Sequence, residues 1–279
     1  MRLIKRLRLA LLRIAVWFVL LLVLFPVLWM ILTSIKPGDL SQMLPPIWAF
    51  TPTLENYRHV LGGQTYTSQA FSVLLLHSAI VTVASTLLAL AVGVPAAYAL
   101  ARVRFRAKRF TAMWILSTIM FPPAVSVIPV FIFAGRLHMM DTYPVLIIPY
   151  AAFALPIVIW MLRGSIKQIP LEIEEAAMVD GASRLTLIRR VVFPLLVPGI
   201  ISASLLCAVL SWNEFLFALA LTRSNVKTAP VGINEFTSMY GTQWGDLTAA
   251  ATVTVAPILV LTLILRRRLV AGLTFGAVK

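Results

Sequence analysis

The sequence has few charged residues and a single cysteine, and both scarcities narrow the class of protein. Only 12% of its 279 residues are charged, whereas 60% are hydrophobic. A soluble domain has roughly a quarter of its residues charged, so this surplus of apolar side chains indicates that lipid surrounds much of the chain. With one cysteine, Cys207, a disulfide within the chain is impossible, and the three scattered histidines make no metal-binding pattern. We therefore expect a membrane protein without a metal site.

Catalytic and nucleotide-binding motifs are absent from the sequence as well. It contains no G-x-x-x-x-G-K-[ST] phosphate loop. Its apolar stretches lack the series of ionisable residues that proton-coupled carriers bury, and no Ser-His-Asp set or paired carboxylates point to an enzyme within the membrane. We expect no enzymatic activity and no cofactor in this chain. If the chain moves a solute, its energy comes from a partner.

Six long stretches carry almost no charge, and we interpret each as a transmembrane helix. The first, 20 residues long, would span about 30 Å as a helix, which matches the hydrocarbon core of a bilayer. None alternates with period two, so a membrane barrel is not indicated. The expected fold is all-α: a polytopic membrane protein, one domain over 1–279, with an uncleaved first helix. The six stretches are 14–33, 71–101, 110–134, 142–162, 191–222 and 247–265.

The basic residues, which give a net charge of +14, are distributed as a membrane topology requires. With both termini in the cytoplasm, 19 of the 24 Lys and Arg residues fall in 1–13, 102–109, 163–190 and 266–279. Only five fall in the outer loops, which satisfies the positive-inside rule. Because no single region collects the cations, binding to nucleic acid is not indicated.

The cytoplasmic loop 163–190 contains four of the ten acidic residues within nine positions. Pro170 is suited to the first turn of a helix, where negative charge is also favoured. Gly181 can end that helix in the left-handed conformation, and Ser183 can cap a second helix. The stretch "EIEEAAMVD" therefore predicts a short helix with a glycine bend after it. Docking to a partner and simple helix capping explain the acids equally well at this point. The four are Glu172, Glu174, Glu175 and Asp180.

This loop resembles the signature of permeases in binding-protein-dependent ABC importers. The matching residues are Glu175-Ala176-Ala177, then Asp180-Gly181, nine residues, and Val191-Val192-Phe193-Pro194. Valine and phenylalanine replace the usual aliphatic residue and leucine. The stretches "TLENYRHVL" (53–61), "SWNEFLFAL" (211–219) and "RRRLVAGLTFGAVK" (266–279) are similar to the carbohydrate-type members, most of all to a shorter, six-helix subunit such as the second permease of the maltose system.

The resemblance implies a multi-pass permease of the bacterial or archaeal cytoplasmic (inner) membrane that forms half of a sugar or polyol pathway. Its partners would be a second permease, two ATPase subunits holding ATP and magnesium, and an extracytoplasmic binding protein. The ATPase-coupling residues would be Glu172, Glu174, Glu175, Ala176, Ala177, Asp180, Gly181 and Pro194. The tail residues Gly272, Gly276 and Lys279 would reach the ATPase dimer.

Two further groups have candidate roles. Glu214 is the one acid inside an expected span, and with Trp212 and Asn213 it is a candidate for the substrate path or for a gate. In the outer loop 223–246, the resemblance implies contact with the binding protein through Asn234, Phe236, Tyr240 and Trp244. Merely packing on the outer rim is an equal alternative for this loop.

Other functions remain open at this point. An importer of the same architecture for another solute, such as glycerol phosphate, would want arginines along its path, and the expected spans contain none. A stand-alone secondary carrier is the alternative from another class. The sequence names no particular sugar.

Overall fold

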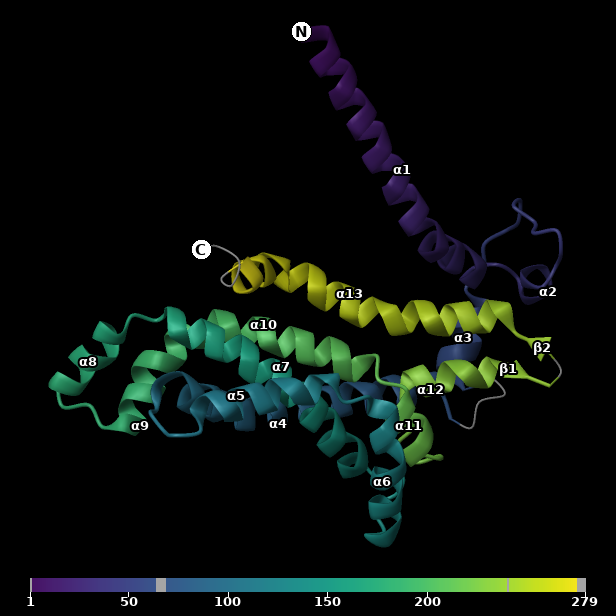
Figure 1. Cartoon of the computed structure of the whole chain (residues 1–279). Helices are drawn as coiled ribbons and strands as arrows, with labels where there is room; N and C mark the ends of the chain where they lie inside the picture. The colour runs from purple at the N-terminus through teal and green to yellow at the C-terminus, as the bar shows by residue number, and fades with distance from the viewer. Residues whose placement is uncertain (1, 64–68, 240, 275–279) are drawn as a thin grey trace. The chain divides into compact units, whose positions relative to one another are not determined.

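The computed structural model describes residues 2–63, 69–239 and 241–274, and almost all of its regular structure is helical. The chain divides into two units, 1–72 with 232–255 and 73–231 with 256–279. Figure 1 shows the elements in chain order. The expectation of a single domain over 1–279 stays a prediction.

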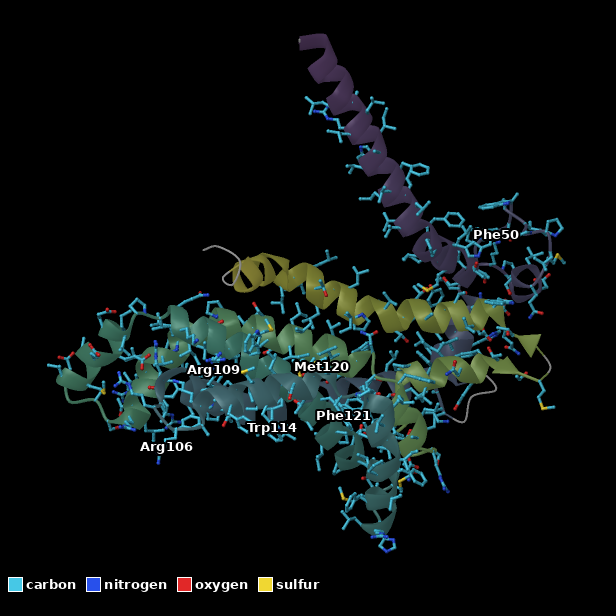
Figure 2. All side chains as sticks on the ribbon, viewed as in Figure 1. Phe50, Arg106, Arg109, Trp114, Met120 and Phe121 are labelled. Atoms are coloured by element: carbon cyan, nitrogen blue, oxygen red, sulfur yellow. The ribbon has the colours of Figure 1, made fainter. Side chains whose placement is uncertain are left out.

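The first unit begins with α1 (Arg2–Ser34), α2 (Gly38–Ser41) and α3 (Glu55–Gly62). The side-chain amide of Asn56 on α3 donates to the carbonyl oxygens of Ser34 and Lys36, at 2.9 and 2.7 Å, and so fixes α3 against the end of α1. The side chains of α1 from 9 to 28 are all exposed, and Figure 2 draws the side chains along this helix as sticks. Since most of them are apolar, lipid or another membrane helix must cover them.

A small hairpin also belongs to the first unit. It follows α12 (Ala229–Ile233) and a 3₁₀ turn (Asn234–Phe236), and it pairs β1 (Thr237–Ser238) antiparallel with β2 (Gly241–Thr242). Then α13 (Trp244–Thr274) begins. The expectation of an all-helical chain thus needs this minor amendment, because the strands cover two residues each.

The second unit holds the longest packed helices. These are α4 (Phe71–Arg102), α7 (Tyr143–Gln168) and α10 (Phe193–Trp212), of which α7 and α10 lie side by side (Figure 1). The close approach of α4 and α10 to α7 depends on two glycines. A Cβ on Gly93 would lie 2.6 Å from Val158 Cγ1, and a Cβ on Gly199 would lie 2.6 Å from Ser165 Oγ. The main core of this unit forms where these helices meet.

The third expected span, 110–134, is wrong as a continuous helix. It consists of α5 (Lys108–Ser117), a 3₁₀ turn (Thr118–Met120) and α6 (Pro123–Arg136), with a bend of 92° between Lys108–Met120 and Pro123–Arg136. Pro122 and Pro123 explain the break, because proline donates no backbone hydrogen bond and keeps the preceding residue out of the helical conformation.

The fifth expected span, 191–222, is also interrupted. It ends as α10 at Trp212, and α11 (Leu216–Leu221) starts after a gap of three residues. The other spans agree in position, although α1, α7 and α13 extend beyond their expected ends. Among the described residues, five helices are long and apolar enough to cross a membrane, and a sixth crossing results if the bent pair counts as one.

Candidate functional site

The loop between α7 and α10 folds as two short helices around a glycine. Helix α8 (Leu171–Val179) starts after Pro170 and carries Glu172 and Glu174 in its first turn. Gly181 has a φ of +85°, in the left-handed region that favours glycine. Ser183 then caps α9 (Arg184–Leu187), because its Oγ accepts a hydrogen bond from the backbone N–H of Thr186. The predicted helix, bend and cap are therefore confirmed.

Beyond α9, the chain does not leave its helical path. A single π-helical turn (Ile188–Val192) leads directly into α10. Leu187, Val192 and Ile169 form a small apolar core beneath the loop, and Ala177 and Tyr98 pack against it. The loop is thus continuous with a membrane span at its second end and has a hydrophobic base of its own.

A polar brace, consisting of Arg102, Glu174, Tyr98 and the carbonyl group of Ile169, fixes α8 to the long helices. The Nε of Arg102 donates to Glu174 Oε1 at 2.6 Å, and its Nη2 donates to the carbonyl oxygen of Ile169 at 2.6 Å. The hydroxyl group of Tyr98 donates to Glu174 Oε2 at 3.1 Å. Glu174 is only 2% exposed. This carboxylate therefore points into the protein, away from any partner surface.

The other predicted coupling residues divide between two sides of the loop. Ala177 is half-buried against the apolar base of the loop. Six of the other predicted coupling residues are exposed. Four large apolar side chains of α8 are exposed as well: Leu171, Ile173, Met178 and Val179. The outer face of α8 is thus a mixed acidic and apolar surface. The exposed predicted residues are Glu172, Glu175, Ala176, Asp180, Gly181 and Pro194.

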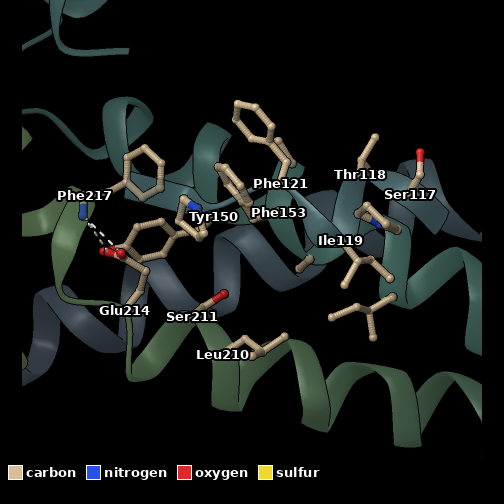
Figure 3. A pocket seen from close by; sticks show the side chains of 15 residues that line it. Ser117, Thr118, Ile119, Phe121, Tyr150, Phe153, Leu210, Ser211, Glu214 and Phe217 are labelled. Carbon is tan, nitrogen blue, oxygen red and sulfur yellow. Dashed lines mark hydrogen bonds between the residues drawn. The ribbon is translucent and has the colours of Figure 1, made fainter. Parts of the chain in front are cut away.

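A cavity of about 670 Å³ lies in the second unit, beside the bend between α5 and α6. Its walls carry the aromatic rings of Phe121, Tyr150, Phe153 and Phe217. Figure 3 shows Tyr150 next to Glu214 at one end of the cavity, and Ser117 and Thr118 at the other. A cavity of this size can hold a small ligand. Because the bend shapes the cavity, a continuous third helix would not have revealed it.

Glu214 lines this cavity and also starts a helix. Its carboxylate oxygens accept hydrogen bonds from the backbone N–H groups of Leu216, Phe217 and Ala218, at 3.0 to 3.4 Å. These bonds satisfy donors that the first turn of α11 leaves free, which explains why the span is interrupted here.

The two neighbours of Glu214 lie elsewhere. Trp212 is buried and is not part of the cavity wall, and Asn213 is exposed, with its side chain bonded to the carbonyl oxygen of Val209. The role of Glu214 in a substrate path or gate stays a prediction, and the sequence analysis did not single out Tyr150, Phe121 or Phe153. An aromatic residue in an apolar span gives no signal of its own.

The loop 223–246 exposes two of its predicted contact residues and buries a third. Asn234 is exposed and Trp244 is half-exposed, whereas Phe236 is buried and packs against Phe71 with ring centroids 6.1 Å apart. Met239, at the hairpin tip, is fully exposed and was not singled out from the sequence. Tyr240 lies outside the described residues.

The last five residues of the tail, 275–279, lie beyond what the structure describes. Gly272 belongs to α13, and Gly276 and Lys279 lie outside the described residues. Within the described residues, no group of three or more His, Cys, Asp or Glu side chains could hold a metal ion.

The known proteins that this chain resembles are transport permeases, and the resemblance extends along nearly the whole chain. Residues 89–274 match the model of the family described as "Binding-protein-dependent transport system inner membrane component". The trehalose transport system permease protein SugB of Mycobacterium tuberculosis is 38% identical over 262 residues, 92% of each chain. The trehalose/maltose transport system permease protein MalG of Thermococcus litoralis is 35% identical over 258 residues, 92% of this chain and 91% of the relative.

A solved structure agrees in fold. A chain of a bacterial ABC transporter involved in the import of the acidic polysaccharide alginate superimposes with a TM-score of 0.78, at 23% identity, over 94% of this chain and 96% of that one. The family match covers most of the chain, including the bent pair, the α8 loop and the cavity. The protein therefore belongs to the inner-membrane permease components of binding-protein-dependent ABC transport systems.

Proposed function

We propose that this chain is a permease subunit of an ATP-driven importer of sugars or polyols, and that it couples to an ATPase subunit through α8. It would form half of the pathway, beside a second permease. Two ATPase subunits, which hold ATP and magnesium, would lie on the cytoplasmic side with both termini, and an extracytoplasmic binding protein would deliver the solute. Relatives named for trehalose and for trehalose/maltose transport support the sugar assignment.

The braced position of α8 is the observation that carries the coupling role. A helix that transmits force needs a firm attachment on one side and a free surface on the other. The ion pair between Arg102 and Glu174 supplies the attachment, and the exposed face with Glu175 and Ala176 supplies the surface. A solvated loop helix would need neither a buried ion pair nor an apolar base.

The brace assigns different roles to neighbouring acids. Glu174 would hold α8 in place, whereas Glu172, Glu175 and Asp180 are free to make polar contacts with an ATPase subunit. Ala176 would allow close approach of that subunit. Gly181 would set the angle between α8 and the chain that leads into α10.

We also propose partner contacts for the tail and for the loop 223–246. The tail residues Gly272, Gly276 and Lys279 would meet the ATPase dimer. On the outer side, Asn234 and Trp244 would contact the binding protein with the exposed hairpin tip, and Phe236 would support the loop from within.

Replacement of Gly181 by valine tests the coupling role. A β-branched residue is strained at a φ of +85°, although the space around Gly181 is open, so the change alters the bend without a steric clash. We expect Gly181→Val to lower sugar uptake by the complete transporter at least about tenfold, with the chain still present in the membrane. Gly164→Val is the matched control, because Gly164 is exposed on α7 and has no positive φ.

The results of these uptake measurements distinguish the proposed function from its alternatives. Normal uptake by Gly181→Val would contradict the coupling role. Sugar uptake by the purified chain alone in liposomes, without ATPase subunits, would instead identify a stand-alone carrier. ATP-driven uptake of glycerol phosphate, with no uptake of any sugar or polyol, would keep the architecture and change the solute.

A further inference from the structure

The cavity beside the bend between α5 and α6 has a buried hydroxyl group, that of Tyr150, without a hydrogen bond of good geometry. The ring of Tyr150 is buried, with 4% of the residue exposed. Its hydroxyl group lies next to the Glu214 carboxylate, but no hydrogen bond of good geometry joins it to that carboxylate or to another described residue. An unsatisfied buried hydroxyl group is destabilising. A ligand that offers a hydroxyl or ether oxygen at this position would remove that penalty.

The charge of the cavity is negative. Among the fifteen described residues that line it, Glu214 is the one acidic residue, and no Lys or Arg side chain is present. Backbone N–H groups hold both oxygens of Glu214 in place, so its carboxylate cannot easily turn away from the cavity. An anionic ligand would be repelled by this fixed carboxylate.

The remaining walls suit a ring with an apolar face. Phe121, Phe153 and Phe217 join Tyr150 there, and most of the other lining side chains are aliphatic. The C–H faces of a sugar ring pack against aromatic rings, because both surfaces are apolar and the face of an aromatic ring is electron-rich. Ser117 and Thr118 add hydroxyl groups at the other end.

We propose that this cavity binds an uncharged saccharide during its passage, with the Tyr150 hydroxyl group as hydrogen-bond donor and Glu214 as the charge that excludes acidic sugars. The inference rests on the proposed function and adds a solute class to it. A lipid chain would leave the Tyr150 hydroxyl group unsatisfied. A uronate or a phosphate would have to approach a carboxylate without any cation nearby.

Direct binding to the assembled transporter tests the inference. The complex of permeases and ATPase subunits would be purified in nanodiscs without the binding protein. Equilibrium binding of radiolabelled maltose, trehalose and digalacturonic acid would then be measured. We expect binding of a neutral disaccharide and none of digalacturonic acid. Tyr150→Phe should weaken neutral binding about fivefold to tenfold, the usual effect of losing one ligand hydrogen bond.

Two further variants complete the experiment. Tyr143→Phe makes the same chemical change on the same helix, two turns from Tyr150 and outside the cavity wall, and should bind as wild type does. Glu214→Gln removes the charge and keeps one oxygen for the backbone donors of α11, so it should admit digalacturonic acid. The melting temperature of each variant complex shows that it is folded.

Three results would overturn the inference. They are unchanged binding by Tyr150→Phe, equal binding of neutral and acidic disaccharides by the wild-type complex, and binding of neither neutral disaccharide. ATP-driven sugar uptake by the same complex, with its binding protein, would leave the proposed function standing in each of these cases. If the complex takes up no sugar at all, the proposed function fails independently of the cavity.

Discussion

Arg102 and Glu174 lie 2.6 Å apart and join the last residue of α4 to the first turn of α8. Removing one partner of a buried ion pair leaves the other charge uncompensated, which destabilises a protein by about 3–5 kcal/mol. We therefore predict that Glu174→Ala lowers both the thermal unfolding temperature of the purified transporter and its sugar uptake. Differential scanning fluorimetry and uptake into liposomes measure the two effects.

The adjacent residue provides the matched control. Glu175 is exposed, so Glu175→Ala should change the free energy of unfolding by no more than about 0.5 kcal/mol. Uptake should still fall, since this side chain faces the proposed ATPase surface. Equal stability of the two alanine variants would show that the brace does not hold α8.

The contact between α7 and α10 depends on the absence of a side chain at Gly199. A Cβ there would lie 3.0 Å from Ser165 Cβ and 2.6 Å from its Oγ. Gly199→Leu should therefore push the two helices apart and destabilise the protein by about 1–3 kcal/mol. Thermal unfolding and the amount of protein in the membrane measure this. Gly135→Leu, at an open position on α6, should have a much smaller effect, and similar losses for both would refute the packing argument.

Asp141 organises residues 223–226, at the start of the loop 223–246. Its carboxylate accepts hydrogen bonds from the backbone N–H groups of Arg223, Ser224, Asn225 and Val226. Burial alone would raise the pKa of Asp141, but the four donors outweigh it and hold the pKa at about 2, below the ordinary 3.8. The carboxylate form is thus the one that the fold stabilises.

The sign of the pH effect follows from that lowered pKa. The contribution of Asp141 is complete above about pH 4 and is lost as the pH falls towards 2. We predict that Asp141→Asn unfolds at a lower temperature than wild type at pH 6, and that the difference shrinks between pH 4 and pH 2.5. Asp39→Asn, at an exposed position, should show no such difference. A gap that stays constant with pH would contradict the role of the charge.

Phe236 and Met239 lie three residues apart in the outer loop and have opposite surroundings. Phe236 is buried against Phe71, so Phe236→Ala should destabilise the protein by about 3–5 kcal/mol. Met239 is fully exposed, and Met239→Ala should leave unfolding unchanged. We predict that Met239→Ala nevertheless reduces the stimulation of ATP hydrolysis by the binding protein. Full stimulation in this variant would remove the hairpin tip from the proposed contact surface.

Features set by neighbouring residues were accessible from the sequence. The start of α8 at Pro170, the left-handed Gly181 and the cap at Ser183 each depend on chemistry within a few positions, and all three were predicted. The same applies to the apolar spans, because hydrophobicity is a local property.

Features set by distant contacts were not accessible. Four acids of one loop looked alike until Arg102, 72 residues before Glu174, distinguished one of them. The pair Pro122 and Pro123 was visible, but hydrophobicity does not report the direction of a helix, so the bend of 92° and its cavity were missed. The resemblance implied that Phe236 contacts a binding protein, with packing as an equal alternative, and in the structure Phe236 packs against Phe71.

The second hydrogen bond of Arg102 has a mechanical consequence. Because the same guanidinium also binds the carbonyl oxygen of Ile169, just after α7, a single planar group joins the ends of two membrane spans to α8. A force on α8 is then transmitted to both α4 and α7 through the Arg102 side chain. A lysine at 102 would keep the charge but lose the rigid fork that reaches both acceptors. The ends of the two spans would then lose the side chain that joins both of them to α8.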